Sequence, residues 1–541
     1  MRSIWTLLLM VAAALGGLYL GWVSGRNAAM GSPYEVAGGF PAAGNPGVSK
    51  IQSVLDMIGN FYVDRVDVDT LQDVAIVEVL KKLDPHSVYI PRSEVAHMAG
   101  ELKSNFGGIG IMFNVSDDTV NVVSVVAGGP SSALGVLPGD KILEVDGRPF
   151  AGKEAKLNTQ KVLDTLRGEI GTTVKIGVVR HGGTRLDFEI VRGEIPLVSV
   201  VAAYEIAPGV GYIKIDRFAE KTYEEMLSGI AKLKAQGCGK LIVDLRSNQG
   251  GFLNVVQLMC NEFLSRGEMI VYTEGAHQRR QDVRADGTGT CRDMGLVVLI
   301  DQYSASASEI FAGAMQDNDR GTIIGRRSFG KGLVQTELAL PDQSSLRLTI
   351  SRYHTPSGRS IQRPYDHGDE EYYGDIVARY RGGELFNADS IHADTLQIFH
   401  TRKGRVVYGG GGIVPDIFVP YDTTTASRYL YTLRAKRICY DYAIGYVEAH
   451  RAELKKMDTP TLLHHLLQTP FLDRLGDFAR KRGVEPPATV SQLERRVIEN
   501  EVRAYAGQAM SGNDGFWPMI NIADPMIDKA LETMGAKSLY N

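Results

Sequence analysis

The sequence predicts a multidomain protein of mixed α/β and α+β class, and three features carry this prediction. Residues 240–256 and 296–317 each join an apolar strand to a turn and a helix, which is the unit of an α/β layer. Residues 106–194 combine short strands with glycine-rich turns and two helices. Residues 425–541 show helical apolar spacing with cap residues. A chain of 541 residues has room for roughly two to four domains.

The composition is that of an ordinary globular protein, with 44% hydrophobic and 23% charged residues. The formal net charge is −4, the isoelectric point lies near 6.3, and no long Lys/Arg run is present. Nucleic acid is therefore not expected as a partner, because a nucleic-acid surface needs a basic patch.

The cysteines and histidines indicate neither a disulfide scaffold nor a metal site, and no cofactor is expected. The four cysteines form no CxxC motif and are expected to be core thiols, with one disulfide left open as an alternative and its pairing undetermined. They are Cys238, Cys260, Cys291 and Cys439. His464 and His465 are adjacent, so on a helix they would point to different sides and could not chelate together.

The N-terminal residues predict export. Arg2 precedes an uncharged apolar run from Ile4 to Val23, which is typical of a signal peptide or a single membrane anchor. The anchor is favoured because the run is long for a signal peptide, although Ala28 and Ala29 leave cleavage open. Either alternative places the rest of the chain in the periplasm or cell envelope. If residues 4–23 are kept, they would anchor it to the inner membrane.

Residues 303–335 contain a candidate nucleophile and a candidate base. A serine cluster opens a helix-patterned segment, and Lys331 follows between two glycines. A serine hydroxyl needs a base beside it, and a lysine can be that base when apolar surroundings such as Phe329 and Leu333 desolvate its ammonium. A serine in the first turn of a helix could also use the free N–H of Ala307 to stabilise an oxyanion. A helix cap and a turn lysine are the structural alternatives.

Residues 101–194 resemble a PDZ domain of the bacterial type. The resemblance rests on FGGIGIMFNV at 106–115, on the strand and turn pattern of 120–147 and on the helix and strand of 157–180. It implies that a glycine-rich loop captures a peptide carboxylate and adds the peptide as a strand. The residues of that loop are Phe106, Gly107, Gly108, Ile109 and Gly110. A plain β-turn is the alternative.

From about residue 50 to 420 the chain resembles the carboxyl-terminal processing peptidases, or tail-specific proteases, which are PDZ-containing serine peptidases with a Ser/Lys dyad. The resemblance rests on LDPHS (83–87), VDLRSNQGG (243–251), SASASEIFAGAMQD (304–317), GKGLVQ (330–335), TPSGRSIQ (355–362) and GIVPDI (412–417). It implies a ClpP/crotonase-like peptidase core with a mixed β-sheet and helices, an inserted PDZ domain and helical segments at both ends. The expected boundaries are a leader at 1–26, a linker at 27–48, helices at 49–100, the PDZ domain at 101–194, the core at 195–424 and a helical domain at 425–541.

The same resemblance implies roles for individual residues. Ser306 would be the nucleophile and Lys331 the general base, with Gln335 orienting the lysine. Ala307 and a glycine of the 250–251 turn would supply the oxyanion N–H groups. The remaining implied roles are structural for Ser304 and Ser308, supporting for Asp317 and a relay from the PDZ domain for Arg167. Gln249 departs from a position that often holds proline.

The function expected from the resemblance is endopeptidase cleavage of proteins whose exposed C-terminal tail docks in the PDZ domain. Rival hypotheses are a histidine-based triad using His86 or His354, a latent PDZ scaffold, and a peptide- or retinoid-type binding protein on the same core. The helical domain at 425–541 is expected to serve scaffolding, homo-oligomer formation or substrate gating, and the residues leave these open. Its tyrosines are expected to be core residues, at 429, 431, 440, 442 and 446.

Overall fold

The computed structural model describes residues 49–95, 105–126, 128–180, 182–391, 397–423 and 427–540, so the predicted leader and linker lie outside the described residues. The chain divides into two compact units, residues 1–76 and 77–541. The described part of the first unit holds helix α2 (Lys50–Phe61) and most of α3 (Val68–Leu80), and Ser49 caps α2 by accepting a hydrogen bond from the Gln52 N–H (3.2 Å). Within the ranges given above, no helix is both long and apolar enough to cross a membrane.

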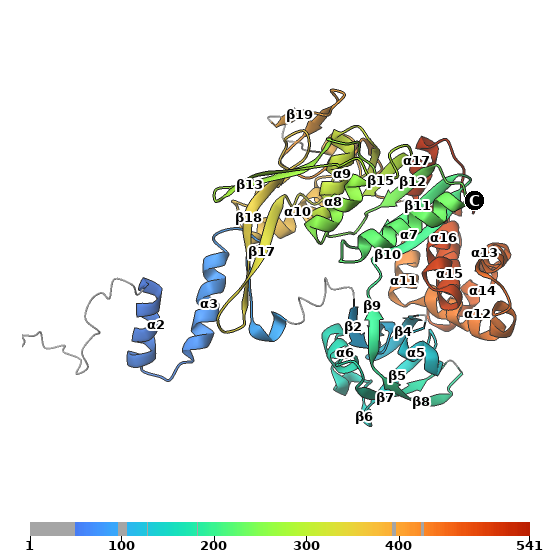
Figure 1. Cartoon of the computed structure of the whole chain (residues 1–541). Helices are drawn as coiled ribbons and strands as arrows, with labels where there is room; N and C mark the ends of the chain where they lie inside the picture. Colours follow the sequence, from blue (N-terminus) through green and yellow to red (C-terminus); the bar gives the residue numbers. More distant parts are fainter. Residues whose placement is uncertain are drawn as a thin grey trace, which may run out of the picture. The chain divides into compact units, whose positions relative to one another are not determined.

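A six-stranded sheet forms the centre of the larger unit (Figure 1). Its strand order is β10-β11-β12-β15-β16-β21, in which β10 and β11 are antiparallel and the other neighbours are parallel. The strands are β10 (Val200–Ala207), β11 (Val210–Ile215), β12 (Lys240–Asp244), β15 (Gly295–Ile300), β16 (Thr322–Gly325) and β21 (Ile417–Phe418). Because β12 and β15 are parallel neighbours, the turns that follow them lie at the same edge of the sheet.

Helices cover both faces of this sheet. On one face, α7 (Thr222–Ala235), α8 (Leu253–Asn261) and α9 (Ala307–Asp317) bury side chains such as Phe311 against the strands. On the other face, α17 (Pro525–Thr533) buries its apolar side against Tyr212, Ile242 and Leu299. The two predicted strand–turn–helix units are therefore confirmed as β12 with α8 and β15 with α9. The last helix of the predicted C-terminal domain packs on the core sheet.

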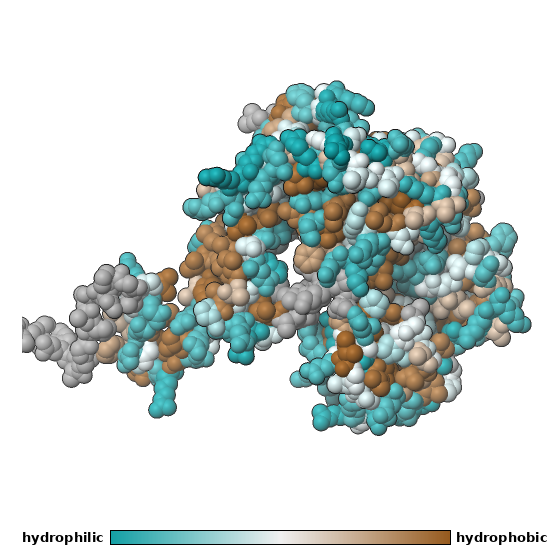
Figure 2. Space-filling view, in the orientation of Figure 1, coloured by the Kyte–Doolittle hydropathy of each residue, from teal (hydrophilic) through white to brown (hydrophobic). Residues whose placement is uncertain are grey.

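An antiparallel sheet extends from the core as an arm. Its order is β1-β18-β13-β14, and β17 also pairs with β18. The strands are β1 (Val88–Ile90), β13 (Met269–Gly275), β14 (Gln278–Arg284), β17 (Leu333–Ala339) and β18 (Ser345–His354). Apolar residues gather on the face of the β17–β18 arm seen in Figure 2, where Leu338 is 44% exposed. Smaller elements of the core are α10 (Asp369–Arg381), the 3₁₀ turn Ala388–Ser390, β19 (Ile398–His400) and β20 (Val406–Tyr408).

The glycine-rich segment forms a small domain with its own core. Its sheet has the order β3-β4-β5-β7-β8, with β6 beside β5, and a separate ribbon pairs β2 with β9. The elements are β2 (Asn105–Gly108), β3 (Ile111–Ser116), β4 (Thr119–Val125), α5 (Pro130–Leu134), β5 (Lys141–Val145), β6 (Arg148–Pro149), the 3₁₀ turn Lys153–Ala155, α6 (Thr159–Leu166), β7 (Thr173–Val179), β8 (Arg185–Val191) and β9 (Gly193–Pro196). β3 is an edge strand, which leaves one side of it available for a further strand.

The C-terminal helices pack on one another through a separate apolar core. They are α11 (Arg428–Ala435), α12 (Ile438–Leu454), α13 (Thr459–Gln468), α14 (Leu472–Lys481), α15 (Gln492–Ser511) and α16 (Asn513–Ile520), followed by the 3₁₀ turn Asn521–Ala523 and α17. α15 and α16 meet at Gly507 and Gly515, where a Cβ on Gly507 would lie 2.3 Å from the Gly515 carbonyl oxygen. Of the five tyrosines expected in the core, only Tyr431 is largely exposed, at 73%.

Two side chains of the C-terminal helices hold the small domain. Arg437 donates from Nη1 to Asn114 Oδ1 (2.8 Å) and to Ser116 Oγ (2.7 Å). The Tyr440 hydroxyl donates to the Val122 carbonyl oxygen (2.9 Å). The helical segment thus contacts both the small domain and, through α17, the core sheet.

Candidate active site

Ser306 lies where the chain leaves β15 and enters α9. It is the N-cap residue of α9 and has φ 56° and ψ −113°, a left-handed conformation that is costly for a residue with a side chain. A strained serine between a strand and a helix is the geometry of a nucleophile turn, which exposes the hydroxyl at the edge of the sheet. Ser306 is half-buried and lines a cleft of about 1030 Å³.

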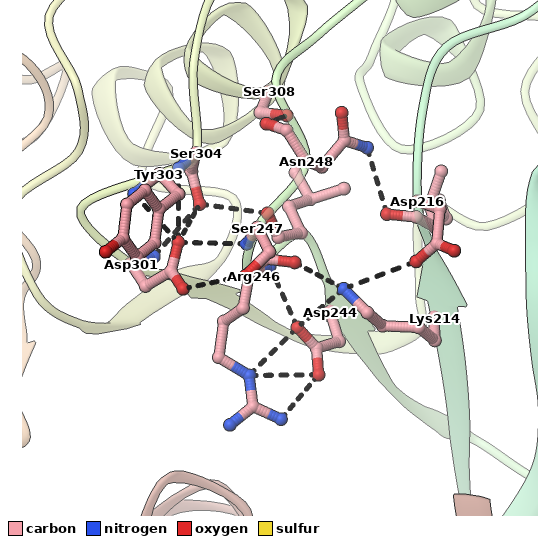
Figure 3. Close-up of polar contacts among 12 residues, drawn as sticks. Lys214, Asp216, Asp244, Arg246, Ser247, Asn248, Asp301, Tyr303, Ser304 and Ser308 are labelled. Carbon is pink, nitrogen blue, oxygen red and sulfur yellow. Dashed lines mark hydrogen bonds and ion pairs between the residues drawn. The ribbon is translucent and has the colours of Figure 1, made fainter. Parts of the chain in front are cut away.

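The two neighbouring serines donate hydrogen bonds to backbone carbonyl oxygens. Ser304 Oγ donates to the Leu245 carbonyl oxygen (2.9 Å), and Ser308 Oγ donates to the Asn248 carbonyl oxygen (2.9 Å). Both side chains are fully buried. They join the turn after β15 to the turn after β12, as Figure 3 shows for Ser304, and this leaves Ser306 as the member of the cluster that faces the cleft.

The oxyanion donors expected beside Ser306 come together in the structure. A Cβ on Gly250, which has φ 105°, would lie 2.8 Å from Ser306 Cβ and 3.0 Å from the Ala307 nitrogen, so only glycine fits there. The Gly250 N–H donates to Asn248 Oδ1 (2.8 Å). The N–H groups of Gly251 and Ala307 have no acceptor among the residues that the structure describes. These two N–H groups are the ones available to an oxyanion.

Lys331 lines the same cleft as Ser306. Burial lowers the pKa of its ammonium, and the positive charge of Arg347 lowers it further. The Lys331 Nζ donates to Gln335 Oε1 (3.0 Å), and Gln335 Nε2 donates to the His86 carbonyl oxygen (2.9 Å). Gln335 therefore fixes the lysine side chain, and His86 fixes Gln335. In the described part of the chain no hydrogen bond joins the Ser306 hydroxyl to the lysine.

Glu309 was not singled out from the sequence, yet its carboxylate connects the two halves of the site. Oε2 accepts from the N–H groups of Ser306 (2.8 Å) and Lys331 (2.9 Å), and Oε1 accepts from the Gly330 N–H (2.7 Å) and the Ser328 hydroxyl (2.5 Å). The side chain is fully buried, which raises the pKa of Glu309 to about 7 against the effect of these donors. The spacing Ser306-x-x-Glu309 is that of a helix capping box, and this signal could have identified it.

Tyr353, on β18, contacts the backbone of Ser306 and Lys331. It was also not singled out from the sequence. Its hydroxyl donates to the Lys331 carbonyl oxygen (2.6 Å) and lies 3.1 Å from the Ser306 carbonyl oxygen. The ring is buried, which raises the pKa of the hydroxyl well above its usual value, so the hydroxyl stays a donor.

Neither histidine proposed as a rival base is placed as one. His86 Nε2 lies 2.8 Å from the Tyr372 hydroxyl, and burial together with the charge of Lys331 lowers the pKa of His86 to about 4. The His354 ring stacks on Tyr272 with 4.6 Å between the ring centroids, and its Nε2 lies 3.3 Å from Glu274. Both side chains thus have structural partners of their own.

Asp317 lies at the far end of α9 and organises a neighbouring loop. Its Oδ1 accepts from Arg359 Nη2 (2.8 Å), and its Oδ2 accepts from the N–H (3.1 Å) and the hydroxyl (2.7 Å) of Ser357. Asp317 and Arg359 are both buried, so this ion pair is shielded from solvent. The contacts fit a supporting role, since the carboxylate is at the opposite end of the helix from Ser306.

Two residues of the small domain reach the catalytic cleft. Phe106 and Arg167 line it together with Ser306 and Lys331, and the Arg167 guanidinium lies 4.3 Å from the centroid of the Phe106 ring. The other residues of the predicted carboxylate loop do not line the cleft. Gly107 and Gly108 pair with β9, while Ile109 is buried in the core of the small domain beside Gly110.

The four cysteines are buried and free.

Comparison with known families agrees with this geometry. The profile of peptidase family S41 matches residues 209–368, and that of the PDZ domain matches residues 107–191. A carboxy-terminal-processing protease of Bartonella bacilliformis is 36% identical over 323 residues, which are 58% of this chain and 72% of that protein. The chain belongs to peptidase family S41. It is accordingly a serine-type peptidase that carries a PDZ domain, and its substrates are proteins or peptides.

A second relative and one solved structure are also similar to this S41 peptidase. The carboxy-terminal processing protease CtpB of Bacillus subtilis is 33% identical over 321 residues, covering 58% of this chain and 66% of that one. The structure of a photosystem II D1 C-terminal processing protease covers 68% of this chain and 91% of its own, at 24% identity and a TM-score of 0.36. Residues 429–512 match a family of unknown function, DUF8443, and helices α11 to α17 of this S41 member lie outside the matched peptidase segment.

Proposed function

We propose that the chain is an endopeptidase that cleaves by a Ser306/Lys331 dyad and selects proteins with an exposed C-terminal tail. The observation that carries the proposal is the cleft itself. It is lined by a strained serine, a lysine with a lowered pKa and the free N–H groups of Ala307 and Gly251. Acyl transfer by a serine with a lysine base requires an exposed hydroxyl, a base whose pKa is lowered and donors for the oxyanion.

In this mechanism Ser306 Oγ attacks the scissile carbonyl carbon while its proton passes to Lys331 Nζ. The Ala307 and Gly251 N–H groups donate to the oxyanion of the tetrahedral intermediate. Lys331 then returns the proton to the leaving amine, and an acyl-enzyme remains on Ser306. Water, deprotonated by Lys331, attacks the ester, and Lys331 returns this proton to Ser306 Oγ as the new C-terminus leaves.

Recognition of the tail is proposed to use the PDZ domain. A peptide can add as a strand to the edge strand β3, with its carboxylate held by N–H groups of the loop at 106–110. Phe106 belongs to this loop and also lines the catalytic cleft, and Arg167 lies over its ring. Binding of a peptide to the loop can therefore change the shape of the cleft through Phe106 and Arg167.

The test compares two peptides of identical sequence, one ending in a free carboxylate and the other in an amide. We expect the amide to be cleaved with a kcat/KM about tenfold lower, because one charge-assisted contact to the tail is lost. Ser306→Ala serves as the control protein that should cleave neither peptide. Equal rates for the two peptides would remove the tail-recognition part of the proposal, whereas cleavage by Ser306→Ala would remove the nucleophile.

We further propose that the protein works outside the cytoplasm, at the periplasm or cell envelope. The support is the uncharged apolar run from Ile4 to Val23 that follows Arg2. Fractionation of cells that produce the full chain should place it in the envelope fraction. Deletion of residues 2–26 should move it to the cytoplasmic fraction, and an unchanged distribution would contradict the proposal.

A further inference from the structure

Asp524 belongs to the C-terminal helices but contacts the turn that follows β12. It is the N-cap of α17, and its Oδ1 accepts a hydrogen bond from the Met526 N–H (2.9 Å). Its other oxygen, Oδ2, accepts from Arg246 Nη1 (2.5 Å). The side chains of Arg246 and Asp524 are only 17% and 20% exposed, so water screens this ion pair weakly.

Asp524 also balances a cluster of buried charges beneath the catalytic turn. Arg246 donates to Asp244 through Nε and Nη2, and Lys214 Nζ lies 3.6 Å from Asp244 (Figure 3). Burial alone would raise the pKa of Asp244, but the Arg246 and Lys214 charges hold it well below its usual range. Lys214 has a second carboxylate partner in Asp216 (3.9 Å), and Asp524 is the second carboxylate partner of Arg246 beside Asp244. Its loss would leave Arg246 with a charge that is costly to bury.

The same turn carries an oxyanion donor. After Arg246, the Ser247 N–H donates to Asp301 Oδ1 (2.9 Å), and the Asn248 carbonyl oxygen accepts from the Ala305 N–H (3.0 Å). Asn248 Oδ1 then holds the Gly250 N–H, which places Gly250 against Ser306 and Ala307, and Gly251 is the next residue of the turn. The path from Arg246 to the oxyanion donors is therefore a short chain of hydrogen bonds and leaves little freedom for the turn.

We propose that Asp524 is a positioning residue for peptide cleavage, which fixes the turn of residues 246–251, and with it the Gly251 N–H, through its ion pair with Arg246. The inference rests on the proposed function and extends it to the C-terminal helices. These helices then have a part in catalysis, because the residue that anchors the turn stands at the start of α17. Asp524 is not among the described residues that line the cleft, so its contribution acts through Arg246.

Asp524→Asn tests the proposal because asparagine caps a helix as well as aspartate does. The variant keeps the Oδ1 acceptor for α17 and removes only the negative charge facing Arg246. Asp458→Asn is the matched control, since Asp458 caps α13 by accepting from the Thr461 N–H (3.0 Å) and lies in the same helical segment. Both variants are compared as full chains, with kcat expressed per active site titrated by a fluorophosphonate.

We expect Asp524→Asn to lower kcat about tenfold with KM changed less than twofold, because the loss concerns an oxyanion donor used only in the transition state. Affinity for a peptide aldehyde, whose adduct places an oxyanion in the same position, should fall in parallel. Asp458→Asn should match the wild type in both. A kcat per titrated site equal to that of Asp458→Asn would overturn the inference, and so would a loss seen only in the titrated fraction or in KM.

The result also separates this inference from the proposed function. Cleavage by Ser306→Ala would defeat the dyad whatever Asp524→Asn does. Normal wild-type cleavage with an unaffected Asp524→Asn would defeat the positioning role alone. If Asp524→Asn folds poorly, Asp524→Ser, which keeps a capping oxygen but also lacks the charge, is measured in the same way and decides the question.

Discussion

Lys331→Ala is expected to lower kcat/KM by about 10³- to 10⁴-fold, the loss that follows removal of a positioned general base. The Lys331 ammonium is partly buried, lies in the Ser306 cleft and is fixed by Gln335, while His86 and His354 contact Tyr372 and Tyr272 instead. Lys234→Ala is the control, because this exposed lysine donates to the Thr290 carbonyl oxygen away from the cleft. Cleavage of a free-carboxylate peptide, followed by mass spectrometry, measures the effect.

The pH profile gives a second readout of Lys331. The neutral amine is the active form, so kcat/KM should rise with pH, and the lowered pKa places this rise below the pH at which an ordinary lysine titrates. Arg347 contributes its positive charge to that lowering, so Arg347→Met should move the rise to higher pH. A profile that stays flat from acid to strongly basic pH would contradict a lysine base.

Glu309→Gln is expected to lower kcat per titrated site by about 10²-fold, because each carboxylate oxygen accepts two hydrogen bonds. Glutamine replaces one oxygen with an NH₂ group, which would face two donors and could satisfy neither. Either the Ser306 and Lys331 N–H groups or the Gly330 and Ser328 donors then lose their acceptor. In the first case the acceptor shared by the Ser306 and Lys331 N–H groups is lost, and in the second the lysine loop loses its attachment to α9 at Gly330 and Ser328.

Glu262→Gln is the matched control for this substitution. Glu262 is also buried and accepts from the Tyr223 hydroxyl (2.7 Å) and the Thr290 N–H (2.9 Å), away from the cleft. Both variants should lose stability in thermal unfolding, by about 1–3 kcal/mol for each buried group left unpaired. Only Glu309→Gln should lose kcat per titrated site. Equal activity of the two variants would show that Glu309 supports the fold and has no part in positioning the site.

Much of the fold could be predicted because it is encoded locally. The strand–turn–helix units of β12 with α8 and β15 with α9 follow from apolar periods and glycine turns within about twenty residues. The parallel pairing of those strands then brings the turn at Gly250 beside Ser306. Ordered motifs along the chain indicated the peptidase core, the PDZ domain and the candidate dyad.

The parts that escaped prediction depend on contacts between distant residues. Arg246 and Asp524 are separated by 278 positions, and nothing in either local sequence names the other as its partner. The packing of α17 on the core sheet depends on which apolar face that sheet leaves open, which periodicity does not reveal. Glu309 is intermediate, because its spacing predicts a helix cap while its acceptor role for Gly330 and Lys331 emerges only when two loops meet.

The strand β18 connects β1 to the backbone of Ser306 and Lys331. Near its start Arg347 pairs with Val88 of β1, a strand that ends at Ile90 only a short length of chain before β2 of the PDZ domain begins at Asn105. At its other end Tyr353 holds the backbone of Lys331 and lies against that of Ser306. β18 pairs with β17 along most of its length and with β1 and β13 at its two ends. A single strand thus joins the backbone that leads toward the PDZ domain to the backbone of Lys331 and Ser306.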